Sequence, residues 1–146
     1  MRISAIGLGL VGLLSVGIWT EAAEAQAVGY TSQQALRGLQ DFNDNCSKCH
    51  GAGARGGNAP PLQGADFDAH WRGKPAKVLW DHISNNMPYD APGSLGQGTY
   101  VSILAYLLQL NGVAAGQSAL VAEPAGMFPA RYFPAPEQFP IMYLMR

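Results

Sequence analysis

Apolar side chains recur at the three- and four-residue spacing of an α-helix in three stretches of the chain, near residues 31–45, 75–86 and 99–110. Between these stretches, Gly51–Gly64 and Tyr89–Gly98 are rich in glycine and proline, which predicts loops. No stretch of the sequence shows the alternating pattern of a β-strand. The pattern therefore predicts an all-α fold of three or more helices.

The ends of these helices carry signals of their own. Thr31 and Gln34 form the pattern of a capping box, so the first helix should begin directly after Thr31. Leu36 and Leu39 follow at helical spacing and extend that helix to about residue 45. Asn111-Gly112 ends the last helix, and because its apolar residues cover more than one face, we expect that helix to be buried on several sides.

The N-terminal segment 1–27 has the pattern of a secretory signal peptide. One arginine precedes an apolar run, and two small-x-small sites follow it. This predicts cleavage after Ala25 or Ala27 and export of the mature protein to the periplasm. The alternative is an uncleaved membrane anchor, since the run is near the shortest length that spans a bilayer.

Charge and length limit the possible partners and the number of domains. Residues 28–146 contain eight Lys or Arg and eight Asp or Glu, so the mature chain lacks the basic field that would indicate nucleic-acid binding. The length suits one ordinary domain, which we place at 28–112. In the C-terminal extension, 113–146, prolines are interspersed with aromatic residues, and we expect an irregular segment that packs on the domain or on a partner.

The chain has two cysteines, and both lie in the pentapeptide Cys46-Ser47-Lys48-Cys49-His50. This order is typical of covalent haem attachment, in which two thiols add to the vinyl groups of the macrocycle and the adjacent imidazole binds the iron. A redox dithiol would need the alternating strands and helices of a thioredoxin-like fold, which the pattern lacks. A zinc site would need two further ligands, for which only His70 and His82 are usual candidates.

From Thr31 to Gly112 the chain resembles the class I monohaem cytochrome c family, in which helices surround one covalently bound haem c. The resemblance is carried by Gly38 and Phe42 before the Cys-x-x-Cys-His motif, by the motif itself, and by Pro60-Pro61-Leu62-Gln63-Gly64, Met87-Pro88 and Leu104-Ala105-Tyr106-Leu107. It implies that the first and last helices cross closely, at a contact formed by Gly38, Phe42, Ile103 and Tyr106.

The resemblance also implies which residues bind the cofactor. Cys46 and Cys49 would form the thioether bonds, and His50 would be the proximal iron ligand. Pro60 would offer its carbonyl to the Nδ1–H of His50, which fixes the tautomer and leaves Nε2 free for the iron. Leu62 would form part of the wall around the haem.

Met87 is the candidate for the distal ligand. A thioether on the second face of the iron stabilises the ferrous state, and Met87 stands beside a helix-stopping proline in a loop, where a methionine is a poor core filler. His82 and His70 are the alternative ligands. Trp71 and Trp80 are expected to shield the haem edge or to fill space.

Iron held by the protein on both faces has no open position for substrate. The expected function is therefore one-electron transfer between partner proteins, without enzymatic activity of its own. Residues 86–112 resemble domains that accompany quinoprotein alcohol or sugar dehydrogenases, which implies a dehydrogenase as electron donor and an oxidase or another cytochrome as acceptor. The alternatives are a haem-based sensor of small ligands and a haem subunit of a membrane respiratory or dehydrogenase complex.

Overall fold

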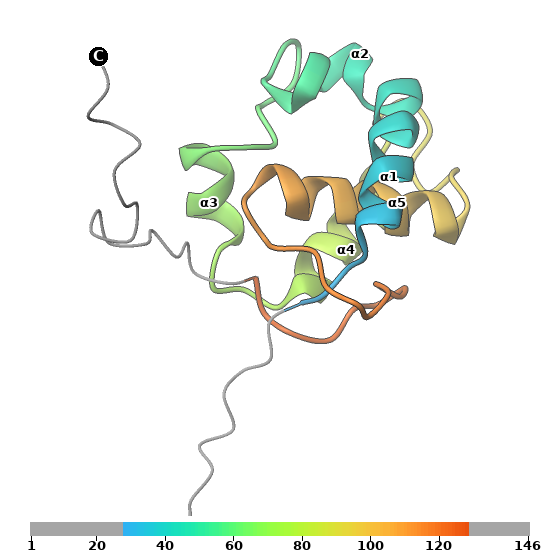
Figure 1. Cartoon of the computed structure of the whole chain (residues 1–146). Coiled ribbons are helices and arrows are strands. Elements are labelled where there is room, and N and C mark those ends of the chain that lie inside the picture. Colours follow the sequence, from blue (N-terminus) through green and yellow to red (C-terminus); the bar gives the residue numbers. More distant parts are fainter. Residues whose placement is uncertain (1–27, 129–146) are drawn as a thin grey trace, which may run out of the picture.

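A computed structural model describes residues 28–128 of the protein. This part of the chain forms five α-helices and one short 3-10 turn, with no strand (Figure 1). The elements are α1 (Ser32–Asn45), α2 (Ser47–His50), η1 (Ala52–Ala54), α3 (Ala65–Trp71), α4 (Ala76–Asn86) and α5 (Gln97–Leu110). The predicted all-α fold is confirmed. The predicted signal peptide and residues 129–146 of the extension lie outside the described residues.

Helix α1 begins and ends where the sequence predicts. The Thr31 hydroxyl accepts from the Gln34 amide at 3.3 Å, and the Gln34 side chain accepts from the Thr31 amide at 3.1 Å, which completes the capping box. The inward face differs from the one that the large apolar residues suggest. Leu36 and Leu39 are 62% and 41% exposed. The buried face consists of Ala35, Gly38 and Phe42.

Helices α1 and α5 cross in close contact, as Figure 1 shows. A Cβ atom on Gly38 would lie 1.8 Å from the Ser102 carbonyl oxygen, so only glycine permits this approach of the two backbones. Beside it, the rings of Phe42 and Tyr106 pack with centroids 5.4 Å apart, and Ile103 belongs to the same buried cluster. The predicted crossing of the first and last helices is therefore present.

Helix α3 (Ala65–Trp71) is an element that the apolar spacing did not predict. It is seven residues long and buries a single side chain, Phe67. The Phe67 ring packs edge-on against the Phe128 ring, with centroids 5.8 Å apart. Its C-terminal end is fixed by an ion pair between Asp68 and Arg72 at 2.6 Å, where both side chains are largely buried. This helix closes one side of the core between the glycine-rich loop and α4.

Helix α4 (Ala76–Asn86) follows Pro75, which stands directly before its first residue, as predicted. Leu79 and Ile83 face the core, one turn apart, together with Trp80. Val78 is 44% exposed and does not contribute to that face. The helix ends at Asn86 with Met87 as its C-cap, so the core packing of α4 also fixes where the following loop begins.

After α5, residues 113–128 form a return segment that runs back across the domain (Figure 1). The Tyr30 hydroxyl donates to the Val113 carbonyl at 2.7 Å near its start. At its end, the Phe128 amide donates to the Lys74 carbonyl at 2.9 Å, and the Phe128 ring is buried. The first half of the extension is thus irregular, as predicted, and packs on the helices.

Within residues 28–128, no helix combines the length and the apolar character needed to cross a bilayer.

Candidate haem site

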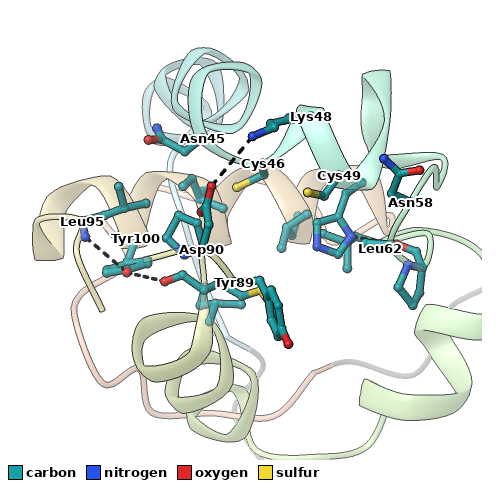
Figure 2. A pocket seen from close by; sticks show the side chains of 18 residues that line it. Asn45, Cys46, Lys48, Cys49, Asn58, Leu62, Tyr89, Asp90, Leu95 and Tyr100 are labelled. Carbon is teal, nitrogen blue, oxygen red and sulfur yellow. Dashed lines mark hydrogen bonds and ion pairs between the residues drawn. The ribbon is translucent and has the colours of Figure 1, made fainter. Parts of the chain in front are cut away.

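A cavity of about 540 Å³ opens between α2, the glycine-rich loop, α4 and α5 (Figure 2). Its volume is within the range of roughly 300–1,000 Å³ that is usual for cofactor pockets. Apolar side chains from two helices and two loops form most of its wall, among them Leu62, Ile83, Leu95, Ile103 and Leu107. The cavity is therefore suited to a largely apolar group of cofactor size.

The Cys-x-x-Cys-His motif forms one wall of this cavity. Cys46 stands at the junction of α1 and α2, and its carbonyl accepts from the amides of Cys49 and His50 at 3.1 and 3.0 Å. Three residues apart on one helical turn, the two cysteines face the same side. Both thiols and the His50 ring line the cavity, and neither cysteine is in a disulfide.

The glycine-rich loop folds back against the motif and orients the imidazole. His50 Nδ1 lies 2.8 Å from the Pro60 carbonyl oxygen. Because a carbonyl can only accept, Nδ1 is the donor in this contact, which leaves Nε2 as the ring nitrogen available to a metal. The loop is itself tied to the motif, since the Ala59 amide donates to the Cys49 carbonyl at 2.9 Å. Gly57 fits here because a Cβ would lie 2.9 Å from that same carbonyl.

The chemistry of Cys46 differs from that of a redox dithiol. Burial, together with the smaller electrostatic effects of Asp41 and Cys49, raises the pKa of the Cys46 thiol to about 11. Catalytic Cys-x-x-Cys pairs instead have a cysteine with a lowered pKa, roughly 3.5–7.5. Among residues 28–128 no three His, Cys, Asp or Glu side chains gather into a metal site. The redox-dithiol and zinc interpretations therefore lack support.

Met87 reaches the same cavity from the loop that joins α4 to α5. Its carbonyl accepts two hydrogen bonds, from the Tyr100 hydroxyl at 2.6 Å and from the Gly93 amide at 3.2 Å. The structure thus brings Met87 and His50 to one site, although 37 positions separate them in the chain. Tyr100 also lines the cavity and was not among the predicted site residues.

Leu62 lines the cavity from a loop in which both its backbone amide and its backbone carbonyl are hydrogen-bonded. Its amide donates to the Ala54 carbonyl at 2.9 Å, and its carbonyl accepts from the Asn111 side chain at 3.0 Å. Sequence reasoning identified Asn111 only as a helix stop. Its second role could have been suspected from the presence of an amide side chain next to a long apolar helix.

The remaining predicted candidates lie away from the cavity wall. Trp80 is buried and packs edge-on against Tyr100, with ring centroids 6.4 Å apart. Trp71 is partly buried and packs against the His82 ring, with ring centroids 5.5 Å apart. His70 is exposed and bonds to the backbone of its own helix. Neither His70 nor His82 lines the cavity, so the structure gives no support to either as an iron ligand.

Polar side chains surround the mouth of the cavity. Lys48 from α2 and Asp90 from the opposite loop form an ion pair at 3.9 Å, with both side chains largely exposed (Figure 2). Tyr89 beside them is 86% exposed. An exposed pair of this kind contributes roughly 0–1 kcal/mol to stability. The mouth is thus open to solvent and only loosely bridged.

Residues 33–107 match a family model described as cytochrome C oxidase, cbb3-type, subunit III. The chain belongs to the class I cytochrome c family. Membership implies electron transfer through covalently bound haem c. The cavity fits that group, because two thiols and an imidazole with a free Nε2 meet there between apolar walls.

Among solved structures, this cytochrome is similar to the sulfane dehydrogenase SoxCD from Paracoccus pantotrophus, with 25% sequence identity and a TM-score of 0.50. The match covers 82% of this chain and 65% of that chain, so the cytochrome spans less than two thirds of the SoxCD chain. Among curated proteins, no sequence matches this chain significantly.

Proposed function

We propose that this cytochrome is an exported one-electron carrier with one haem c, whose iron is bound by His50 and Met87. The main support is that both side chains and both cysteines line one cavity. The proposal includes a signal peptide at 1–27, cleaved after Ala25 or Ala27, a haem domain that begins at residue 28, and a periplasmic location.

Each residue of the site would have a defined task. Cys46 and Cys49 would hold the macrocycle through thioether bonds, and Pro60 would keep Nδ1 of His50 protonated. When bound, the haem supplies a one-electron iron couple. Leu62 and the apolar side chains of α4 and α5 would surround the haem with apolar contacts, which favours electron transfer with little reorganisation.

The partner would be a dehydrogenase that releases electrons one at a time. The likeness to the SoxCD structure supports this class of donor, because that protein is a dehydrogenase. A quinoprotein dehydrogenase as donor and an oxidase or another cytochrome as acceptor remain the specific proposal. In this role the cytochrome has no substrate site of its own.

The test begins with the periplasmic fraction of cells that mature c-type cytochromes. The wild-type protein should be coloured, should keep its haem in a denaturing gel, and should show the weak long-wavelength sulfur-to-iron band in the ferric state. Cys46→Ala should weaken haem retention on the gel. A colourless wild-type protein would overturn the haem assignment.

Ligation is tested separately with Met87→Ala. This variant should keep its haem, lose the sulfur-to-iron band, bind carbon monoxide when ferrous, and fall in reduction potential by a sizeable part of the roughly 0.8 V that axial ligands span. Met127→Ala is the matched control, because Met127 lies outside the cavity wall. If wild-type protein already binds carbon monoxide readily and lacks the band, the site belongs to a ligand sensor.

Association is tested by N-terminal sequencing and fractionation. A mature N-terminus after residue 25 or 27 in a detergent-free periplasmic fraction supports the exported carrier. A retained leader and recovery only with detergent would indicate a membrane-bound subunit of a respiratory or dehydrogenase complex.

A further inference from the structure

The loop that carries Met87 is closed at both ends by one buried hydroxyl. Tyr100 lies in the first turn of α5 and is 4% exposed. Its hydroxyl donates to the Met87 carbonyl at 2.6 Å and accepts from the Leu95 amide at 3.3 Å, as the dashed lines in Figure 2 show. Residues 87–95, here called the ligand loop, therefore start and finish on the same oxygen atom.

Between its two ends the ligand loop is in contact with solvent. Residues 89–94 are all exposed. Two short turns order this stretch locally. The Ala91 amide donates to the Pro88 carbonyl at 3.0 Å, and the Ser94 amide donates to the Ala91 carbonyl at 3.2 Å. These bonds shape the loop without joining it to a helix. The bonds to Tyr100 are the ones that connect its ends to α5.

Tyr100 is itself held firmly. Its ring packs edge-on against Trp80 of α4 at an interplanar angle of 82°, and both rings belong to the main buried cluster. The hydroxyl uses its donor on Met87 and an acceptor position on Leu95, so its hydrogen bonds have a defined direction. A rigid side chain thus fixes the backbone from which the Met87 thioether extends into the cavity.

We propose that Tyr100 is a positioning residue for iron ligation by Met87. It holds the ligand loop in the closed arrangement in which the thioether faces the cavity, and loss of its hydroxyl raises the fraction of molecules in which Met87 has left the iron. This inference rests on the proposed function, since it presupposes that Met87 is the distal ligand.

The test is Tyr100→Phe in the mature haem protein, which keeps the ring and removes both hydrogen bonds. Two readouts report ligation without any partner protein: the intensity of the ferric sulfur-to-iron band, and the rate at which the ferric protein binds cyanide. Losing a net hydrogen bond to the closed loop should raise the cyanide binding rate roughly tenfold. The band should weaken in the same variant.

Tyr30→Phe is the matched control. Tyr30 is also buried in the main cluster, and its hydroxyl likewise donates to a backbone carbonyl, that of Val113 at 2.7 Å. Both variants should therefore lower the thermal midpoint, whereas only Tyr100→Phe should change the band and the cyanide rate. If the two variants show the same band and the same cyanide rate as the wild type, the inference is wrong.

Met87→Ala separates this inference from the proposed function. If Met87→Ala abolishes the band while Tyr100→Phe leaves it intact, ligation stands and only the positioning role of Tyr100 fails. If the wild type lacks the band, the ligation proposal fails first. Should Tyr100→Phe not accumulate as haem protein, hydrogen exchange of the wild type decides: the Leu95 amide should exchange at least tenfold more slowly than the Tyr89 amide, and equal rates would refute the role of Tyr100.

Discussion

At the scale of single residues, buried polar side chains link the cavity wall to the helices. Asn111 is 1% exposed, and its side-chain amide donates to the Leu62 carbonyl at 3.0 Å and to the Leu107 carbonyl at 2.9 Å. The side-chain carbonyl oxygen of Asn111 accepts from the Gly64 amide at 3.3 Å. One side chain therefore satisfies backbone groups of both the α5 terminus and the loop that carries Leu62.

We predict that Asn111→Ala lowers the free energy of unfolding by about 2–3 kcal/mol, because the partly buried Leu62 carbonyl and Gly64 amide lose their side-chain partner, at roughly 1–3 kcal/mol each. Urea unfolding followed by far-UV circular dichroism measures the loss. Gln109→Ala, an exposed position two residues earlier in α5, should change stability by less than about 0.5 kcal/mol. Equal stability of the two variants would contradict the role assigned to Asn111.

At the scale of elements, the crossing of α1 and α5 depends on the absence of a side chain at Gly38. We predict that Gly38→Ala destabilises the protein by at least about 2 kcal/mol, since the new Cβ would meet the Ser102 carbonyl at 1.8 Å and the backbones would have to separate. Gly98→Ala in α5 is the control. A Cβ there meets open space, so the higher helix propensity of alanine should stabilise by up to about 1 kcal/mol. Calorimetry that shows the same sign for both substitutions would refute this account of the crossing.

The long helices could be predicted because their signals are local. The Thr31 capping box and the end of α4 before Met87-Pro88 depend on neighbouring residues, and both were found from the sequence. Helix α3 was missed because it buries only Phe67, and its partner Phe128 lies 61 positions away. The inward face of α1 was obscured for a related reason: two of its three buried residues are small, and the exposed leucines dominate the apolar pattern.

The candidate site divides in the same way. The Cys-x-x-Cys-His motif and Met87-Pro88 were visible as short patterns, and the structure brings them to one cavity. Tyr100 and Asn111 were not visible, because their partners are backbone atoms of distant loops and a backbone atom has no sequence signature. What the sequence omits is therefore mainly the support around the site.

At the scale of the whole molecule, the return segment 113–128 closes the fold. It is bonded to the segment before α1, where the Val28 amide donates to the Met127 carbonyl at 3.1 Å. It is also bonded to the start of α4, where the Ala76 amide donates to the Gly126 carbonyl at 2.9 Å. A chain that ends at residue 112 would leave Phe67 and neighbouring core residues uncovered. The stability of the haem domain therefore depends on the segment that precedes α1 and on the segment that follows α5.

Two buried tyrosines, one bonded to the return segment and one at the crossing of α1 and α5, make the stability of the whole fold sensitive to alkaline pH. Burial raises the pKa of Tyr30 and of Tyr106 above the ordinary value of about 10. Unfolded tyrosines lose their protons near pH 10 while these two keep theirs in the folded protein, so their contribution is fully present below pH 10 and is lost as pH rises through the folded pKa. Urea midpoints should therefore hold steady up to about pH 10 and fall as the pH rises further. The fall should be smaller in Tyr30→Phe/Tyr106→Phe, which retains every other titrating group. An equal fall in the wild type and the double variant would show that these tyrosines are not its source.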